Sequence, residues 1–209
     1  SASVEVNDPD PDPDPDPGSG VVVFDDFERA DSLVLGSAST GQAWQVWSGA
    51  GRVVGGEAGA RVSGYTLGVV DSGVSEGTAS VTVPVVGGEA WLIVRGSDRG
   101  NYWRFGSSDG VSYSLQQIRG WWFGPAVIDS YASVVPGDGD RLSCELGAEI
   151  RCSVNGTLVA GSSDGFNADS TFVGFATGAG GAVPVSRFDE FSVSDGVGAG
   201  GELVADVGV

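Results

Sequence analysis

Short runs of alternating apolar and polar residues dominate the chain. In Arg141–Leu146, for example, Leu142, Cys144 and Leu146 alternate with polar or charged neighbours. A period of two places successive side chains on opposite faces of a strand, whereas an amphipathic helix needs apolar residues at positions i, i+3 and i+4. No stretch keeps the helical period over three turns. The pattern therefore predicts an all-β protein.

Turn-forming residues separate nearly all of these runs, among them Gly55-Gly56, Asp109-Gly110 and Asn155-Gly156. Many short strands at this spacing predict a two-sheet antiparallel jelly-roll sandwich. The predicted strands are Val21–Phe27, Ala43–Trp47, Arg52–Val54, Ala60–Val62, Thr66–Val70, Ala79–Val85, Trp91–Arg95, Tyr102–Gly106, Val111–Ile118, Ala126–Ala132, Arg141–Leu146, Ile150–Val154, Thr157–Ala160, Phe172–Ala176 and Arg187–Ser194.

The chain divides into three parts, residues 1–20, 21–195 and 196–209. Asp8–Pro17 is a run of five Asp-Pro repeats, which predicts an extended, semi-rigid polyproline II arm. The arm is either a passive linker or a segment that lays Ser1–Asn7 on a neighbouring subunit. Residues 21–195 are long enough for one jelly-roll domain. The glycine-rich residues 196–209 form either a loose tail or a second docking strand.

Charge and missing residue types exclude several classes of function. A net charge of −18 favours solubility and disfavours nucleic-acid binding. No run approaches the roughly 18 apolar residues of a membrane span, and the first residues lack the pattern of a secretion signal. The chain has no His and only two Cys, which excludes imidazole catalysis and zinc sites built from these residues. We therefore expect no cofactor.

The two cysteines fall in a hairpin whose register the sequence fixes. A three-residue turn at 147–149 pairs Leu146 with Ile150 and sets Cys144 directly opposite Cys152, with the apolar residues of both strands inward. A cross-strand disulfide is one outcome. We favour two buried thiols, as expected of a pair of buried cysteines in a reducing compartment.

An earlier hairpin, Trp91–Gly106, predicts a surface rich in aromatic and arginine side chains. Pairing Trp91–Gly96 with Asn101–Gly106 turns Leu92, Val94, Trp103 and Phe105 toward the core. Rings and guanidinium groups on one sheet face suit glycan binding, because rings stack on sugar C–H faces and arginine donates to hydroxyl or acid groups. The alternative is an ordinary sheet surface or a subunit contact. The candidate residues on the opposite face are Trp91, Ile93, Arg95, Tyr102 and Arg104.

Two further groups of residues bear on function. Trp121 and Trp122 are neighbours on a loop, which predicts a contact site because both cannot easily be buried in one sheet.

Asp25-Asp26 and Asp189-Glu190 are adjacent acids, so the two side chains of each pair point to opposite faces of a strand and not across a substrate cleft. We therefore expect no enzyme. Asp25, Asp26 and Asp189 remain weak candidates for a structural Ca²⁺.

A series of motifs spans about residues 24–194. The motifs are Phe24–Ser32, Gly41–Trp44, Val70–Val74, Ile93–Arg95, Asn101–Phe105, Gly137–Leu142, Val154–Gly156 and Arg187–Phe191. In content and order, this series resembles one known type of module, the concanavalin A-like (laminin G-like) jelly roll of actinobacterial phage tail and virion surface proteins.

The resemblance implies a minor tail or capsid decoration protein, assembled in the host cytoplasm and exposed on the virion. Its partners would be other virion proteins, reached through residues 1–20, and host surface glycans, and it would act as a homo-oligomer or in a larger assembly. One alternative is a carbohydrate-binding module of a bacterial surface or secreted protein. A glycoside hydrolase is a weaker alternative, because the chain lacks the same-face acidic string of related glucanases.

Overall fold

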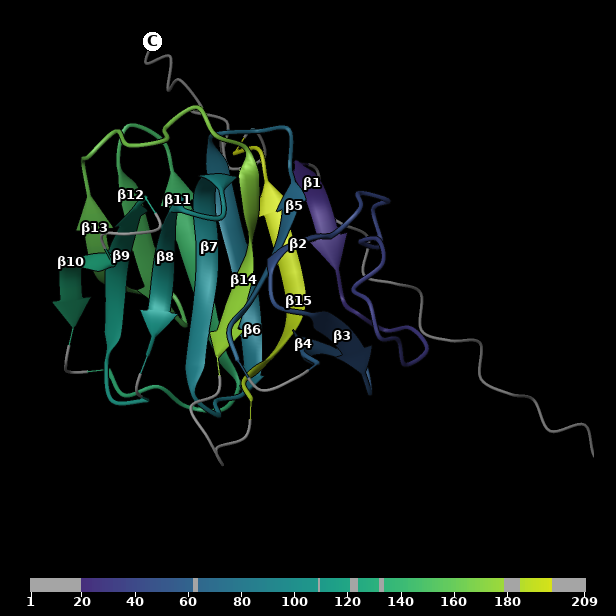
Figure 1. Ribbon diagram of the computed structural model, residues 1–209. Coiled ribbons are helices and arrows are strands. Elements are labelled where there is room, and N and C mark those ends of the chain that lie inside the picture. The colour runs from purple at the N-terminus through teal and green to yellow at the C-terminus, as the bar shows by residue number, and fades with distance from the viewer. Residues whose placement is uncertain are drawn as a thin grey trace, which may run out of the picture.

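The protein is an all-β sandwich in the computed structural model, which describes residues 20–61, 64–108, 110–120, 124–131, 134–178 and 185–196 (Figure 1). The predicted arm and tail fall outside these ranges except for Gly20 and Gly196. No helix occurs within them, so none of the described segments is a helix able to cross a membrane.

Two antiparallel sheets make up the sandwich. Sheet I has eight strands in the order β13-β12-β11-β6-β15-β4-β3, with β1 paired to β15, and sheet II has seven in the order β10-β9-β8-β7-β14-β5-β2. The strands are β1 Val21–Asp25, β2 Gln45–Ser48, β3 Gly51–Val54, β4 Glu57–Ala60, β5 Thr66–Asp71, β6 Gly77–Val85, β7 Glu89–Asp98, β8 Asn101–Ser107, β9 Tyr113–Arg119, β10 Pro125–Tyr131, β11 Asp140–Leu146, β12 Ile150–Val154, β13 Thr157–Ser162, β14 Phe172–Gly178 and β15 Arg187–Ser194.

The main core fills the space between the sheets. The prediction that Leu92 pairs with Phe105 and Val94 with Trp103, all facing inward, is confirmed. From sheet I, residues such as Phe188 complete the same cluster. With this face of each sheet buried, the opposite faces form the two broad outer surfaces of the molecule.

The cysteine hairpin has the predicted register but not the favoured chemistry. Leu146 pairs with Ile150 and Cys144 with Cys152, as expected. The two cysteines form a disulfide, and so the interpretation as free thiols is wrong. That interpretation was based on the expected redox compartment, which no residue of the chain encodes, whereas the register alone places the two side chains next to each other.

One strand begins earlier than predicted. The sequence predicted Ala60–Val62, but β4 runs over Glu57–Ala60. Gly55 and Gly56 both have positive φ, at 62° and 77°, and form a two-residue turn that pairs Val54 directly with Glu57. Glycine tolerates this conformation, so the tight turn starts the return strand at once.

Candidate functional site

The outer face of sheet II carries a second hydrophobic cluster that includes Trp91, Ile93 and Tyr102. Four of the five predicted face residues do lie together here, namely Trp91, Ile93, Tyr102 and Arg104. Trp91 is fully buried, however, and the guanidinium carbon of Arg104 lies 4.0 Å from the centre of its ring. Arg104 therefore covers the Trp91 ring. Contrary to the expectation from the sequence, this ring is not available to stack on a sugar.

Arg104 is fixed in place by its neighbours. Its Nε and one terminal nitrogen donate to Oε1 of Gln116 at 3.0 and 2.7 Å, and Gln116 in turn donates to Ser114. The ring of Trp91 supports the other side of the guanidinium through a cation–π contact. A cation held in this way loses little conformational freedom when it binds a ligand.

Two tyrosines lie beside this arginine. The hydroxyls of Tyr65 and Tyr102 are 3.1 Å apart and share a hydrogen bond. Burial, and next the neighbouring Tyr102, raise the pKa of Tyr65 well above its usual value, while Arg104 opposes the shift. The Tyr65 phenol therefore stays protonated at physiological pH and can donate a hydrogen bond.

These side chains line a pocket of about 210 Å³, which we call the tyrosine pocket. Leu67 and Ile118 contribute apolar surface, and Tyr65, Tyr102 and Arg104 contribute polar groups, in addition to Arg99 and Ser48. An apolar surface with a few fixed polar groups is typical of small-ligand sites, although this pocket is smaller than the roughly 300–1,000 Å³ of drug-sized ones. The remaining lining residues are Ser48, Arg99, Gly100, Gly120, Gly124 and Pro125.

Arg95 does not share this face, contrary to the prediction. It has φ of +49°, and the pairing of β7 with β8 shifts between Val94 and Asp98. This bulge interrupts the alternation, and the buried Arg95 side chain donates instead to the carbonyl of Gly147 in the β11–β12 turn of sheet I. Arg95 therefore connects the two sheets and is not part of the pocket.

The other predicted contact residues, Trp121 and Trp122, lie outside the described residues. Gly120 and Gly124 on either side of that segment line the tyrosine pocket. Whether the two tryptophans form a contact site stays a prediction.

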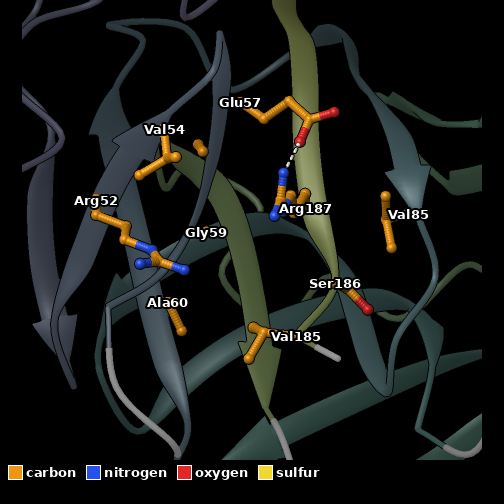
Figure 2. Close-up of a pocket in the computed structure, with 10 residues that line it drawn as sticks. Arg52, Val54, Glu57, Gly59, Ala60, Val85, Val185, Ser186 and Arg187 are labelled. Atoms are coloured by element: carbon orange, nitrogen blue, oxygen red, sulfur yellow. Dashed lines mark hydrogen bonds and ion pairs between the residues drawn. The ribbon is translucent and has the colours of Figure 1, made fainter. Parts of the chain in front are cut away.

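A second pocket, which the sequence did not predict, lies on the outer face of sheet I. Arg52 of β3, Gly59 of β4 and Arg187 of β15 are paired residues in one row across three strands. Figure 2 shows the two arginines on either side of Gly59, with Glu57 bonded to Arg187 at 2.7 Å. We call this pocket of about 280 Å³ the arginine trough. Its other lining residues are Val54, Ala58, Ala60, Val85, Val185 and Ser186.

The calcium candidates have other partners. Asp25 is fully buried, and its two oxygens accept hydrogen bonds from Arg29, from the indole of Trp44 at 2.6 Å and from the Phe27 amide. This leaves its carboxylate engaged in a structural ion pair. Asp26 accepts from Ser39 and from a backbone amide. Within the described residues, no three acidic or cysteine side chains are grouped so as to hold a metal ion.

The hydrogen bonds of Asp25 lie where the first and last strands of the domain meet. Strands β1 and β15 lie side by side, with Asp25 opposite Phe191. Phe27, Trp44 and Phe191 pack around the buried carboxylate, with the Trp44 and Phe191 ring centres 5.1 Å apart. Asp25 and the aromatic rings around it therefore have a structural role.

No family model matches the chain, and no curated protein matches it in sequence. Solved structures do share its fold. The carbohydrate recognition domain of Emp47p aligns with a TM-score of 0.54 and 12% identity, over 86% of this chain and 99% of that one. The corresponding domain of Emp46p, in a potassium-bound form, gives 0.51 and 12%, over 74% and 89%.

The GH43 protein BlXynB from Bacillus licheniformis aligns with a TM-score of 0.53 and 16% identity, over 82% of this chain but only 39% of that chain. At these identities the similarity concerns the fold alone. It supports the concanavalin A-like jelly roll that the sequence motifs implied.

Proposed function

We propose that this protein is a carbohydrate-binding module whose ligand occupies the tyrosine pocket. The observation that carries the proposal is the fixed Arg104 beside the hydrogen-bonded Tyr65–Tyr102 pair, over an apolar floor. Sugars offer both kinds of surface, since their hydroxyls hydrogen-bond and their C–H faces pack on apolar groups. Two structures of the same fold are described as carbohydrate recognition domains, which is consistent with this proposal.

The proposed activity is binding without chemistry. Glycoside hydrolysis needs two carboxyl groups facing one another across the substrate. The tyrosine pocket is lined by no acidic residue among those that the structure describes. The shared fold of the GH43 protein does not change this, because this chain spans less than half of that protein.

A glycan array with the full chain tests the proposal. We expect at least one glycan to bind, and Tyr102→Phe and Tyr65→Phe each to weaken binding by about tenfold, because each removes one hydroxyl and keeps the ring. Tyr113→Phe is the matched control, since Tyr113 bonds Asp140 and does not line the pocket. A complete absence of binding, or equal weakening by all three variants, would refute the assignment.

We also propose that the module is displayed on a phage virion, as a minor tail or decoration protein that attaches through residues 1–20. The support is the ordered series of motifs between residues 24 and 194. Antibodies against the protein should label purified particles, and deletion of residues 1–20 should prevent its incorporation. A chain that copurifies with no particle proteins in infected cells would contradict this setting while leaving the glycan proposal intact.

A further inference from the structure

We propose that the arginine trough is a second binding site, for a sugar that carries one carboxylate. The trough lies on the outer face of sheet I, whereas the tyrosine pocket lies on the outer face of sheet II. The two sites share no lining residue. This second site is therefore independent of the first in structure and in the experiments that test it.

The trough exists because Gly59 leaves its floor empty. Val53, Ala58 and Phe188 occupy the inner face of these strands and belong to the core, so Gly59, Arg52 and Arg187 belong to the outer face. Gly59 does not have a positive φ. A Cβ there would meet only the Ser186 carbonyl at 3.5 Å and Cγ of Arg187 at 3.9 Å, which are ordinary contacts. Neither backbone conformation nor packing requires glycine at this position.

The charge of the trough selects a single negative group. Glu57 pairs with Arg187, while Arg52 has no carboxylate partner among the residues that the structure describes. The three charged side chains that line the trough together carry one net positive charge, and the carboxyl groups of Asp189 and Glu28 lie close by without lining it. The net charge of the chain is −18. One carboxylate neutralises that excess, whereas a dianion would leave a negative charge in an already acidic protein. The planar guanidinium of Arg52 matches a carboxylate with two parallel hydrogen bonds.

The remaining surface of the trough suits the ring of a sugar. Val54, Val85 and Val185 line it, and Val54 and Val85 lie on the same outer face as the two arginines. A carboxylated pyranose presents an acid at one end and C–H groups along its ring. Arg52 would hold the acid and the valines would contact the ring.

Titration with methyl glucuronide, followed by NMR of the full chain, tests this proposal against methyl glucoside as the neutral counterpart. We expect methyl glucuronide to bind at least tenfold more tightly, and the binding to weaken as NaCl concentration rises. Arg52→Gln should reduce the affinity about tenfold or more. Gly59→Val should remove binding, because its side chain fills the floor of the trough.

Two controls separate the site from general effects. Arg61→Gln removes an exposed arginine that does not line the trough and should leave the affinity unchanged. Tyr102→Phe alters the other pocket and should also leave it unchanged. Equal affinity for the two methyl glycosides, no effect of Arg52→Gln, or tighter binding of inorganic phosphate at pH 7.5 would each overturn the proposal. None of these outcomes affects the tyrosine-pocket test, which has its own variants.

Discussion

At the residue scale, Arg95 shows how one backbone angle redirects a side chain. Strict alternation along β7 would place it with Trp91 and Ile93 on the outer face. A left-handed conformation at Arg95 and a bulge reverse its direction. Its buried position lowers its pKa, and Glu76 and Asp169 oppose that shift. Alternation alone could not predict this bulge, although Gly96 lies within it and glycine inside a strand often marks such an irregularity.

Asp189 is a residue whose titration should change stability. Burial is the main cause that raises its pKa to about 6, and the nearby carboxylates of Glu190, Glu28 and Glu57 act in the same direction. The unfolded value is about 3.9, so the folded chain binds this proton more tightly. The carboxyl group therefore destabilises the fold increasingly as pH rises from about 4 to about 6, and its full cost applies above pH 6.

Asp189→Asn should remove this cost. An amide keeps an acceptor for the Glu190 amide, which Asp189 binds at 2.7 Å. In urea unfolding, we expect the variant to be more stable than the wild type at pH 7.5 and equal to it near pH 4. Glu145→Gln removes one charge from an exposed position of the same sheet and controls for net charge. A variant that is no more stable at pH 7.5 would show that Asp189 ionises without cost.

At the element scale, periodicity and turn residues predicted most of the fold. The Asn155-Gly156 turn joins β12 to β13 with φ of 50° and 78°, and the cysteine hairpin has the predicted register. These features are local, because each turn fixes the pairing of its own two strands. The jelly-roll class followed from the number and spacing of such strands.

The order of strands within each sheet is not local, and this explains why the arginine trough was missed. Arg52 and Arg187 are far apart in the chain, and they face one another only because β4 lies between β3 and β15. No property of either residue alone signals that neighbour. The tyrosine pocket was half predicted, since Tyr102 and Arg104 share one hairpin face, while Tyr65 comes from outside the hairpin.

The β11–β12 hairpin should keep its register without its disulfide. The bond joins cysteines eight residues apart, a short loop for which chain entropy predicts a stabilisation of about 2.5 kcal/mol. We expect Cys144→Ala with Cys152→Ala to lose about this much in urea unfolding, and a reducing agent to lower the melting temperature of the wild type only. The inward pairs Leu142–Val154 and Leu146–Ile150 should hold the register in the wild type and in the double cysteine variant alike.

A matched control lies on the next rung of the same hairpin. Ser143 and Ser153 are paired across the strands, and their hydroxyls share a hydrogen bond of 2.9 Å. Ser143→Ala with Ser153→Ala removes both partners from a partly exposed pair, so it should cost less than about 1 kcal/mol. If the serine and cysteine variants lost equal stability, the cross-link itself would contribute nothing.

At the scale of the whole molecule, the two pockets lie on opposite sides of the sandwich. The core between the sheets is continuous, so a ligand on one outer face cannot reach the other pocket. The acidic chain should repel dense polyanions at long range, while the trough attracts an isolated carboxylate at short range. The protein would therefore prefer glycans in which acidic sugars are spaced among neutral ones.

This arrangement leads to a prediction about bridging. The test uses two dextran carriers. One carrier is neutral and bears the glycan that binds best in the array, and the other bears glucuronide at low density. Because each face binds one of them, the wild-type protein should bridge the two carriers into large particles detectable by light scattering. Tyr102→Phe and Gly59→Val should each reduce the scattering strongly while binding to one carrier remains. Bridging that survives in both single-site variants would contradict the two-face arrangement, because a multimer using one site would then suffice.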